Sequence, residues 1–405
     1  MVNLAAGLLF GIANAYFVPD WANFYSKGQV DVVGLCPIDL PLSCSNSTPI
    51  ENTCCFESPS GLFAQTQFWD YNPAVGANET WTLHGLWPDL CGGLFQQFCD
   101  KPLEIRKGDL ERIIVDEFGD KDLFKLIQEN WNNLGGDDES LWVHEFNKHG
   151  TCVNTIKPKC YGPDGKKNQN VYDYFNRTVS LYTQYPTFDF LADKGIVPSL
   201  TESYTYDQVL QALTEGSGKD NVFFKCDRNN ALQEVYYYHY LQGPFSTGNF
   251  VQIPFKGQSR CPQEGIRFFP KGGKNPQPRP PKDPSGMSGY LKPSGHSGCL
   301  ISSGNYYESG TCAKFRIVAL QFKGYNILSS KGVCAIDERG DFSCNHQNKP
   351  SESQFGYDSS KRTILYGGID KWCLDESNSF GHGRFQQTPI KVSDGDCESF
   401  SLKLD

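Results

Sequence analysis

The sequence has no surplus of positive charge and no hydrophobic run long enough to cross a membrane. Its 37 Lys and Arg against 46 Asp and Glu give a formal net charge of −9, which argues against a protein that binds polyanions tightly whatever their sequence. The N-terminal apolar run covers only residues 3–15, too short for a transmembrane helix. We therefore expect no membrane span, and a chain suited to conditions in which its carboxylates are partly protonated.

Methionine is scarce, with two residues, whereas sixteen cysteines indicate an oxidising compartment. The even count is compatible with complete pairing, although spacing does not give the connectivity. The vicinal pair Cys54-Cys55 raises the alternative of a metal site, but no Cys-x-x-Cys and no matching pair of histidines accompanies it. Disulfides are therefore the better interpretation.

The N-terminus is typical of a secretory signal peptide, which we predict over residues 1–15. Its apolar run ends in Ala-Asn-Ala, a small-x-small cleavage pattern. Because no Lys or Arg precedes the run, a buried N-terminal helix is the alternative. Passage through the secretory pathway agrees with Asn-x-Ser/Thr sequons, candidate glycosylation sites, at Asn46, Asn78 and Asn176.

A histidine-rich segment at residues 144–152 predicts a helix with an unusual polar face. No Gly or Pro occurs from 139 to 149, and Gly150 follows as a C-terminal stop. Glu145, Lys148 and His149 stand at i, i+3 and i+4 and share one face, which His144 borders. Two imidazoles, an acid and a cation on this face favour an active-site wall. An ordinary solvated Glu–Lys pair is the alternative.

Another histidine lies in a segment that alternates like a strand. Residues 81–86 carry His84 in the middle, and Pro88 is expected to end the strand. A lone histidine at such a position would be a core residue. Because a second histidine-rich segment exists, and cysteines near both can tie the two together, we expect His84 to face the helix that carries His149.

The segments WTLHGLWPD at residues 81–89 and HEFNKHGTC at 144–152 resemble the two active-site segments of the ribonuclease T2 family. The resemblance covers about residues 30–270. It implies a metal-independent acid endoribonuclease without a cofactor, acting as a monomer on single-stranded RNA with low base specificity. It also implies a protein that is secreted or kept in the vacuole lumen, with stress-dependent release into the cytoplasm.

The resemblance assigns roles in a reaction that starts from the 2′-hydroxyl of RNA. It implies His149 as general base and His84 as general acid, roles that an imidazole can take in mildly acid solution. Glu145 and Lys148 would stabilise the pentacovalent phosphorane, and His144 would contact the phosphate. The products would be a 2′,3′-cyclic phosphate and then a 3′-phosphate.

A base-binding pocket needs an aromatic face and a polar group that reads the base edge. Trp87, Asp89 and Phe95 match family positions with these roles. A carboxylate accepts from an exocyclic amine, which favours adenine or cytosine over uracil. Related enzymes often carry tyrosine where Phe95 stands, so the stacking surface is kept and a hydroxyl is lost.

The resemblance also implies five disulfides among the first ten cysteines, two of which would tie the loop after the first segment and the end of the second into one scaffold. The implied bridges are Cys36–Cys55, Cys44–Cys91, Cys54–Cys160, Cys99–Cys152 and Cys226–Cys261.

Helical stretches mixed with aromatic strands, without regular alternation, predict an α+β fold. The helical stretches lie at residues 104–134, 171–185 and 205–213. Together with the resemblance, this pattern implies a ribonuclease T2-type antiparallel sheet with packed helices over residues 30–268.

The composition changes after this region. Residues 269–297 are rich in Pro, Gly and Lys and predict a linker. Residues 298–405 hold six cysteines and short β-type runs, which predict a small disulfide-rich all-β domain with three bridges, one closing a hairpin at Cys334 and Cys344. The domain resembles a C-terminal extension of some fungal family members.

Polysaccharide or cell-wall binding is one interpretation of the C-terminal domain. Aromatic residues that could offer a stacking surface there are Tyr306, Tyr307, Tyr366 and Trp372. The alternative is that these aromatics fill a small core.

Two rival functions fit parts of the sequence. A zinc hydrolase would place His-Glu-x-x-His on one helix face, whereas His144 and His149 are five residues apart. A non-enzymatic binding protein built on the same fold would lack a catalytic histidine, and both His84 and His149 are present. We predict no metal site.

Overall fold

The computed structural model describes residues 36–37, 39–46, 53–218, 222–254, 259–272, 286–320, 324–337, 339–350, 353–381, 386–393, 395 and 397–405. The predicted signal peptide at residues 1–15 lies outside them, as does part of the predicted linker. Among the described residues, no helix combines the length and apolar character needed to span a bilayer.

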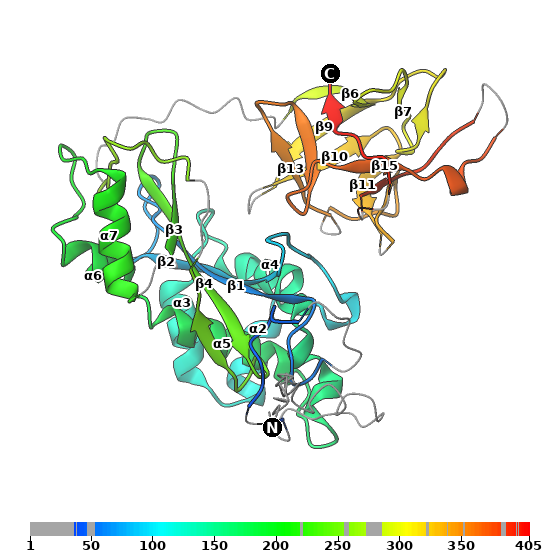
Figure 1. The fold of residues 1–405 in the computed structure, drawn as a ribbon. Coiled ribbons are helices and arrows are strands. Elements are labelled where there is room, and N and C mark those ends of the chain that lie inside the picture. Colours follow the sequence, from blue (N-terminus) through cyan, green and yellow to red (C-terminus); the bar gives the residue numbers. More distant parts are fainter. Residues whose placement is uncertain are drawn as a thin grey trace, which may run out of the picture.

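The first part of the chain is an antiparallel sheet with helices packed along it (Figure 1). The sheet has the order β2-β1-β4-β3, and β5 extends β4. Sheet and helices together form the α+β architecture that the sequence predicts. The strands are β1 (Ser60–Phe68), β2 (Thr82–Leu90), β3 (Val222–Cys226), β4 (Leu232–Gln242) and β5 (Asn249–Gln252).

Alternation along the strands separates the two faces of this sheet. In β1, Phe63 packs into the main helix–sheet core, whereas Leu62 and Ala64 belong to a smaller cluster on the opposite face. Trp87 of β2 packs against that smaller cluster. Trp87 is thus directed away from the main core, whereas Trp81 of the same segment belongs to that core.

Side-chain caps mark the starts of α3, α4 and α7. Asp120 and Asp137 accept backbone hydrogen bonds at the starts of α3 and α4, and Thr205 forms a capping box with Gln208 at the start of α7. The α-helices are α2 (Asp109–Glu111), α3 (Lys121–Asn130), α4 (Asp138–Lys148), α5 (Gln169–Tyr182), α6 (Thr187–Ala192) and α7 (Tyr206–Ser217). Short helical segments are η2 (Lys101–Leu103), η3 (Arg112–Glu117), η4 (Gly150–Cys152), η5 (Asn154–Ile156) and η6 (Pro158–Tyr161).

Two expectations about these elements are wrong. The stretch 104–134 is not one helix, because the π-helical η3 ends at Glu117, and Gly119, whose φ of 76° favours glycine, precedes the start of α3. Pro88 does not end β2, which continues to Leu90. Since β2 is the edge strand, the missing N–H of Pro88 can be accommodated at the outer side of the sheet.

The first part contains all five of the disulfides that the family resemblance implies: Cys36–Cys55, Cys44–Cys91, Cys54–Cys160, Cys99–Cys152 and Cys226–Cys261. The C-terminal part contains Cys299–Cys312, Cys334–Cys344 and Cys373–Cys397. Cys334 and Cys344 stand directly opposite each other in a hairpin.

The C-terminal part is an all-β domain built on a second antiparallel sheet. Its strands follow the order β13-β14-β17-β6-β9-β10-β11-β12-β16-β15, and a further β13–β10 pairing closes part of this path on itself. The elements are β6 (Ser288–Pro293), β7 (Cys299–Leu300), β8 (Tyr306–Tyr307), β9 (Lys314–Ala319), β10 (Tyr325–Ser329), β11 (Gly332–Ile336), β12 (Asp341–Asn345), β13 (Phe355–Asp358), β14 (Thr363–Tyr366), β15 (Trp372–Leu374), η7 (Glu376–Asn378), β16 (Ile390–Val392) and β17 (Leu402–Leu404).

The predicted linker at 269–297 is too long at both ends. Lys271 is buried in the first part, where its Nζ donates to the carbonyl oxygens of Ala77 and Thr80 at 3.0 and 2.6 Å. At the other end, β6 pairs with β9 and β17 and alternates between exposed and buried residues. Its Pro and Gly content suggested a tether, but pairing on both sides makes it a central strand of the second domain.

The aromatic candidates for polysaccharide stacking are largely in the C-terminal core. Trp372 is completely buried and Tyr306 is 8% exposed, and both belong to the domain's apolar cluster. The interpretation that these two residues fill a core is therefore confirmed. Polysaccharide binding by the domain stays a prediction.

Candidate active site

His84 occupies an irregular position in β2. Thr66 of β1 pairs with Gly85, but the next residue, Gln67, pairs with Leu83, so His84 has no residue opposite it. Such a bulge redirects a side chain, and the His84 ring stacks on Phe68 with centroids 3.9 Å apart.

The helix α4 brings the second histidine segment beside this bulge. Its apolar face, including Trp142 and Phe146, is buried in the main core. The Trp142 indole donates to the Trp131 carbonyl at 2.6 Å, and the Trp131 indole donates to the His84 carbonyl at 2.8 Å. Two tryptophans therefore connect the helix to the backbone of the histidine strand.

Glu145 is the centre of the arrangement. Its Oε1 lies 3.4 Å from His84 Nε2, and its Oε2 lies 3.9 Å from His149 Nε2. All three side chains are buried. A Cβ at position 85 would collide with the Glu145 carboxylate, so glycine leaves the room that this carboxylate occupies. On the helix face predicted from the spacing, Glu145 and His149 are buried and Lys148 is half-buried, so the alternative of a solvated Glu–Lys pair is wrong.

Trp87 takes part in this cluster directly. Its indole N–H donates to Glu145 Oε2 at 2.8 Å, and its ring stacks on His149 with centroids 5.1 Å apart. The sequence assigned Trp87 only to a base pocket. The structure adds contacts with the acid and with the second imidazole, which spacing along the chain does not reveal.

Burial and neighbouring charges set the protonation states. Burial by itself raises the pKa of Glu145, but His84, with His149 and His144, outweighs this and holds it well below its ordinary value. Burial holds the pKa of His149 well below its ordinary value, although Glu145 opposes the shift. An ionised carboxylate thus lies beside a neutral imidazole at neutral pH.

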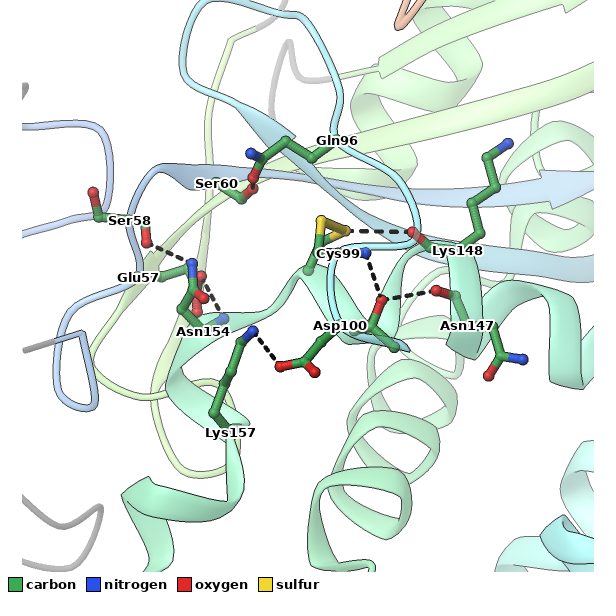
Figure 2. The surroundings of a disulfide bond; sticks show 12 residues. Glu57, Ser58, Ser60, Gln96, Cys99, Asp100, Asn147, Lys148, Asn154 and Lys157 are labelled. Atoms are coloured by element: carbon green, nitrogen blue, oxygen red, sulfur yellow. Dashed lines mark hydrogen bonds and ion pairs between the residues drawn. A yellow bond between two sulfur atoms is a disulfide. The ribbon is translucent and has the colours of Figure 1, made fainter. Parts of the chain in front are cut away.

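His144 and Lys148 lie on the flank of the same helix. Burial lowers the pKa of His144 to about 3, with a further contribution from Lys148. Burial lowers the pKa of Lys148 to about 8, against the opposing influence of Glu145 and Asp89. Lys148 therefore remains largely cationic at pH 7 and below. Figure 2 shows its side chain extending from the helix in the direction opposite to Asn147.

The remaining predicted pocket residues are close to this flank. Asp89, near the end of β2, pairs with Phe95 of the loop that follows, and Lys148 Nζ lies 5.9 Å from the centroid of the Phe95 ring. Burial raises the pKa of Asp89 to about 8, while Lys148 and Lys225 oppose the shift. Below that pH, Asp89 is a neutral acid that can donate as well as accept.

Lys225 is a neighbour of this pocket that the sequence analysis missed. Its Nζ donates to the Tyr236 hydroxyl at 2.6 Å and lies 3.5 Å from Glu234 Oε2. Tyr236 in turn meets Trp87 edge-on at 5.9 Å. The alternation of β4 could have placed Tyr236 on this face, but only after the order of strands in the sheet was known.

A disulfide and backbone hydrogen bonds hold the end of α4 against the loop that follows β2 (Figure 2). Cys99 is bonded to Cys152, and the Cys99 N–H donates to Thr151 Oγ1 at 3.1 Å. The Phe98 N–H donates to the Lys148 carbonyl at 3.0 Å. The base-pocket loop and the catalytic helix are consequently one covalently linked unit.

In the part of the chain that the structure describes, no group of three or more His, Cys, Asp and Glu side chains is arranged to hold a metal ion. Asn78 is exposed, and Asn46 and Asn176 are partly exposed.

Comparisons with known proteins agree with this geometry. The family model described as Ribonuclease T2 family matches residues 60–253, and the one described as RNase T2-like C-terminal domain matches residues 283–403. A Ribonuclease T2-like protein of Debaryomyces hansenii is 52% identical over 384 residues, which cover 95% of this chain and 94% of that protein. Ribonuclease T2-like 1-A of Candida albicans is 40% identical, covering 92% of this chain and 95% of that protein.

Among solved structures, the crystal structure of Actibind, described as a T2 ribonuclease, is similar to the first part of the chain. It is 36% identical with a TM-score of 0.55, and the match covers 60% of this chain and all of Actibind. From the His84–Glu145–His149 cluster, the two family matches and the full-length relatives, we conclude that this chain belongs to the ribonuclease T2 family, a family of endoribonucleases.

Proposed function

We propose that this protein is a metal-independent acid endoribonuclease that cleaves single-stranded RNA by attack of the 2′-hydroxyl, with low base specificity. The observation that carries the proposal is the pair of buried imidazoles, His84 and His149, on the two oxygens of one ionised Glu145. General acid–base cleavage of RNA needs two such proton carriers within reach of one phosphodiester.

In the first step, the neutral Nε2 of His149 takes the proton of the 2′-hydroxyl, and O2′ forms a bond to phosphorus. The bond from phosphorus to O5′ breaks, and the protonated imidazole of His84 gives its proton to O5′. Burial supports the neutral form of His149, and Glu145 supports the protonated form of His84. The products are a 2′,3′-cyclic phosphate and a free 5′-hydroxyl.

In the second step, the roles reverse. His84 takes a proton from water, the oxygen of that water bonds to phosphorus, and the bond from phosphorus to O2′ breaks. His149 returns the proton to O2′, which leaves a 3′-phosphate and the enzyme in its starting state. No oxidant and no further reactant is needed.

The equatorial oxygens of the phosphorane gain negative charge in both steps. Lys148, still a cation in acid solution, supplies the compensating charge, and a buried site makes that interaction stronger than it would be in water. We assign His144 to the phosphate as well. Glu145 orients both imidazoles, with the Trp87 indole fixing the carboxylate.

The base next to the scissile phosphate would stack on Trp87 and Phe95, with Asp89 at its edge. Because burial raises the pKa of Asp89 to about 8, the group is a neutral acid under acid conditions. It can then both donate to and accept from a base edge, which is compatible with weak discrimination between bases.

Disulfide content supports a compartment outside the cytosol. Eight bridges occur within the described residues, and such frameworks persist in oxidising environments. We propose that the protein is a monomer of the secretory pathway, secreted or vacuolar, with Asn46, Asn78 and Asn176 as glycosylation sites.

Digestion of four homopolymeric RNAs in EDTA, across a pH series, tests the proposal. We expect cleavage in chelator, products with 2′,3′-cyclic phosphate ends early in the reaction, and no cleavage of DNA or of 2′-O-methyl RNA. Loss of activity on chelation, or cleavage of the 2′-O-methyl substrate, would reject the mechanism.

A further inference from the structure

The C-terminal domain contacts the loop that carries Phe95. Gln97 Nε2 donates to the Gln354 carbonyl at 3.2 Å, and the two glutamines are only 9% and 7% exposed. The hydroxyl of Tyr366 is buried, which raises its pKa, while hydrogen bonds with the side chains of Gln97 and Ser353 lower it. The side chain of Gln97 therefore contacts Gln354 and Tyr366 of the second domain.

A glycine turn of the C-terminal domain lies directly against Phe95. Tyr366 and Ile369 close the turn by two hydrogen bonds of 3.0 Å. A Cβ on Gly367 would lie 3.0 Å from the Phe95 carbonyl oxygen, and a Cβ on Gly368 would lie 3.6 Å from its ring. Both glycines have positive φ, 58° and 81°, so the turn provides a close backbone approach that a side chain would obstruct.

The catalytic domain holds this loop by one disulfide at each end and by individual contacts between the two disulfides. Cys91 is bridged to Cys44 and Cys99 to Cys152, while Leu94 near the tip is 38% exposed. Between these anchors, contacts within the catalytic domain include the Asp89–Phe95 pairing and a 3.2 Å hydrogen bond from Ser60 to Gln96. The Leu90 N–H also donates to the Leu94 carbonyl at 2.6 Å, the Phe98 N–H donates to the Lys148 carbonyl at 3.0 Å, and Lys148 Nζ lies 5.9 Å from the Phe95 ring centroid. The second domain adds the contacts of Gln354 with Gln97 and of Gly367 and Gly368 with Phe95.

We propose that the C-terminal domain is a positioning element of the active site: its Tyr366–Gly368 turn and Gln354 carbonyl hold the loop through Gln97, and so fix Phe95 beside Lys148 for the incoming base. The inference rests on the proposed role of Phe95 in the base pocket. An aromatic side chain fixed before binding loses less conformational entropy when the base stacks on it. Gln97 and Tyr366 act through Phe95 and are positioning residues, not catalytic ones.

Steady-state kinetics of full-length variants test this inference. Substrates are the four dinucleoside phosphates with adenosine, cytidine, guanosine or uridine on the 5′ side. We expect Tyr366→Phe and Gln97→Leu each to raise KM by about two- to tenfold, the effect of one hydrogen bond, with kcat within about twofold and an unchanged pH profile. Preference among the four bases should weaken. Tyr290→Phe, which alters an exposed tyrosine of the same domain, is the matched control and should leave KM unchanged.

A double-mutant cycle distinguishes positioning from general destabilisation. In a Phe95→Ala background, adding Tyr366→Phe should raise KM no further, because the residue being positioned is gone. Full additivity of the two changes would overturn the inference, as would wild-type KM and base preference in both single variants. If Phe95→Ala alone alters neither KM nor base preference, the proposed role of Phe95 fails together with the inference. If only Phe95→Ala has an effect, the role of Phe95 stands and the inference alone fails.

Discussion

The two domains are both small, antiparallel and rich in disulfides, but they differ in what they bury. The catalytic domain buries Glu57, His84, Glu145, His149 and Glu234, all of them ionisable. Among the described residues of the C-terminal domain, the buried polar side chains are Asn326, Ser353, Gln354, Thr363 and Thr388, and none of these ionises in the physiological range.

Burying an ionisable group costs free energy unless partners offset it. A domain without a catalytic role has no need for buried ionisable groups, and the C-terminal core is accordingly apolar. In the catalytic domain, His84, Glu145 and His149 form one connected cluster in which the pKa values of Glu145 and His149 are shifted, which is typical of a catalytic site. Glu57 is buried separately, with hydrogen bonds from Asn154 and Thr155. The difference indicates that the chemistry belongs to the first domain and that the second acts through contact.

The disulfides show the same division. Four of the five bridges in the catalytic domain join residues 35 to 106 positions apart, whereas the three in the C-terminal domain span 10 to 24. Long-range bridges hold distant segments, here the two active-site segments, in one arrangement. Short-range bridges close individual hairpins and loops.

The largest expected effect is a loss of RNA cleavage, and it tests whether the catalytic residues all lie in the first domain. We predict that His84→Ala and His149→Ala each reduce RNA cleavage by at least about a hundredfold, the lower scale of general acid–base catalysis. His346→Ala, an exposed histidine of the C-terminal domain, is the matched control and should retain full activity. Circular dichroism would check folding. Near-normal turnover by His149→Ala would remove the proposed base.

The next prediction compares the loss of stability and turnover when a long-range or a short-range disulfide is removed. Replacing Cys99 and Cys152 by serine opens a loop of 53 residues, and replacing Cys334 and Cys344 opens one of 10. Chain entropy alone predicts losses in the free energy of unfolding of about 4 and about 3 kcal/mol. Only the first change should also lower turnover, because it releases the end of α4. Equal turnover in the two variants, measured at a temperature where both are folded, would contradict this prediction.

A pH-dependent effect follows from Glu57, which accepts hydrogen bonds from Asn154 N and from Thr155 N and Oγ1 at 2.9, 3.0 and 2.8 Å. Burial raises its pKa from 4.5 to about 7, although these hydrogen bonds oppose the shift. Because the folded pKa lies above the unfolded one, the stabilisation is complete below pH 4.5 and is lost as the pH rises through about 7. The change is at most about 3 kcal/mol.

We therefore predict that the catalytic domain of Glu57→Gln unfolds at a temperature that depends less on pH between 5 and 7 than in the wild type. No described carboxylate of the C-terminal domain is buried, so calorimetric unfolding of that domain should change little over the same range and serves as the internal control. If the unfolding temperature of Glu57→Gln depended on pH as strongly as that of the wild type, a group other than Glu57 would be responsible for the pH dependence.

The smallest effect concerns the contact between the domains. A protein truncated after Gly272 retains Lys271 and its hydrogen bonds to Ala77 and Thr80, and it retains every proposed catalytic residue. We expect kcat on a dinucleotide within about twofold of the wild type and KM raised by about two- to tenfold, since the contacts to Gln97 and Phe95 are lost. A large loss of kcat in a soluble, oxidised truncated protein would mean that the second domain does more than position the loop.

Much of the active site could be predicted from local patterns. The spacing of Glu145, Lys148 and His149 places them on one helix face because an α-helix repeats every 3.6 residues. The Thr205–Gln208 capping box is a local pattern of the same kind, since its partners are three residues apart. The resemblance of the two histidine segments to the ribonuclease T2 family then supplied the roles.

Other features depend on strand register, and a sequence does not give register directly. The bulge that redirects His84 depends on pairing between residues 16 to 19 positions apart. The space that Gly85 leaves for Glu145 and the Trp87 hydrogen bond to Glu145 involve residues about 60 positions apart. Two further features depend on which strands become neighbours in the folded chain. Pro88 lies in an edge strand, and Ser288–Pro293 is a strand of the second sheet.

The sequence by itself thus determined which residue types are present, which share a helix face and which segments alternate as strands, because these depend on separations of a few residues. The tertiary structure decided which groups are buried together, which of them are ionised, and that the C-terminal domain reaches Phe95 through Gln97. The physical reason is that protonation and positioning depend on desolvation and on contacts between segments far apart in the chain, which arise only when the two domains have folded and packed.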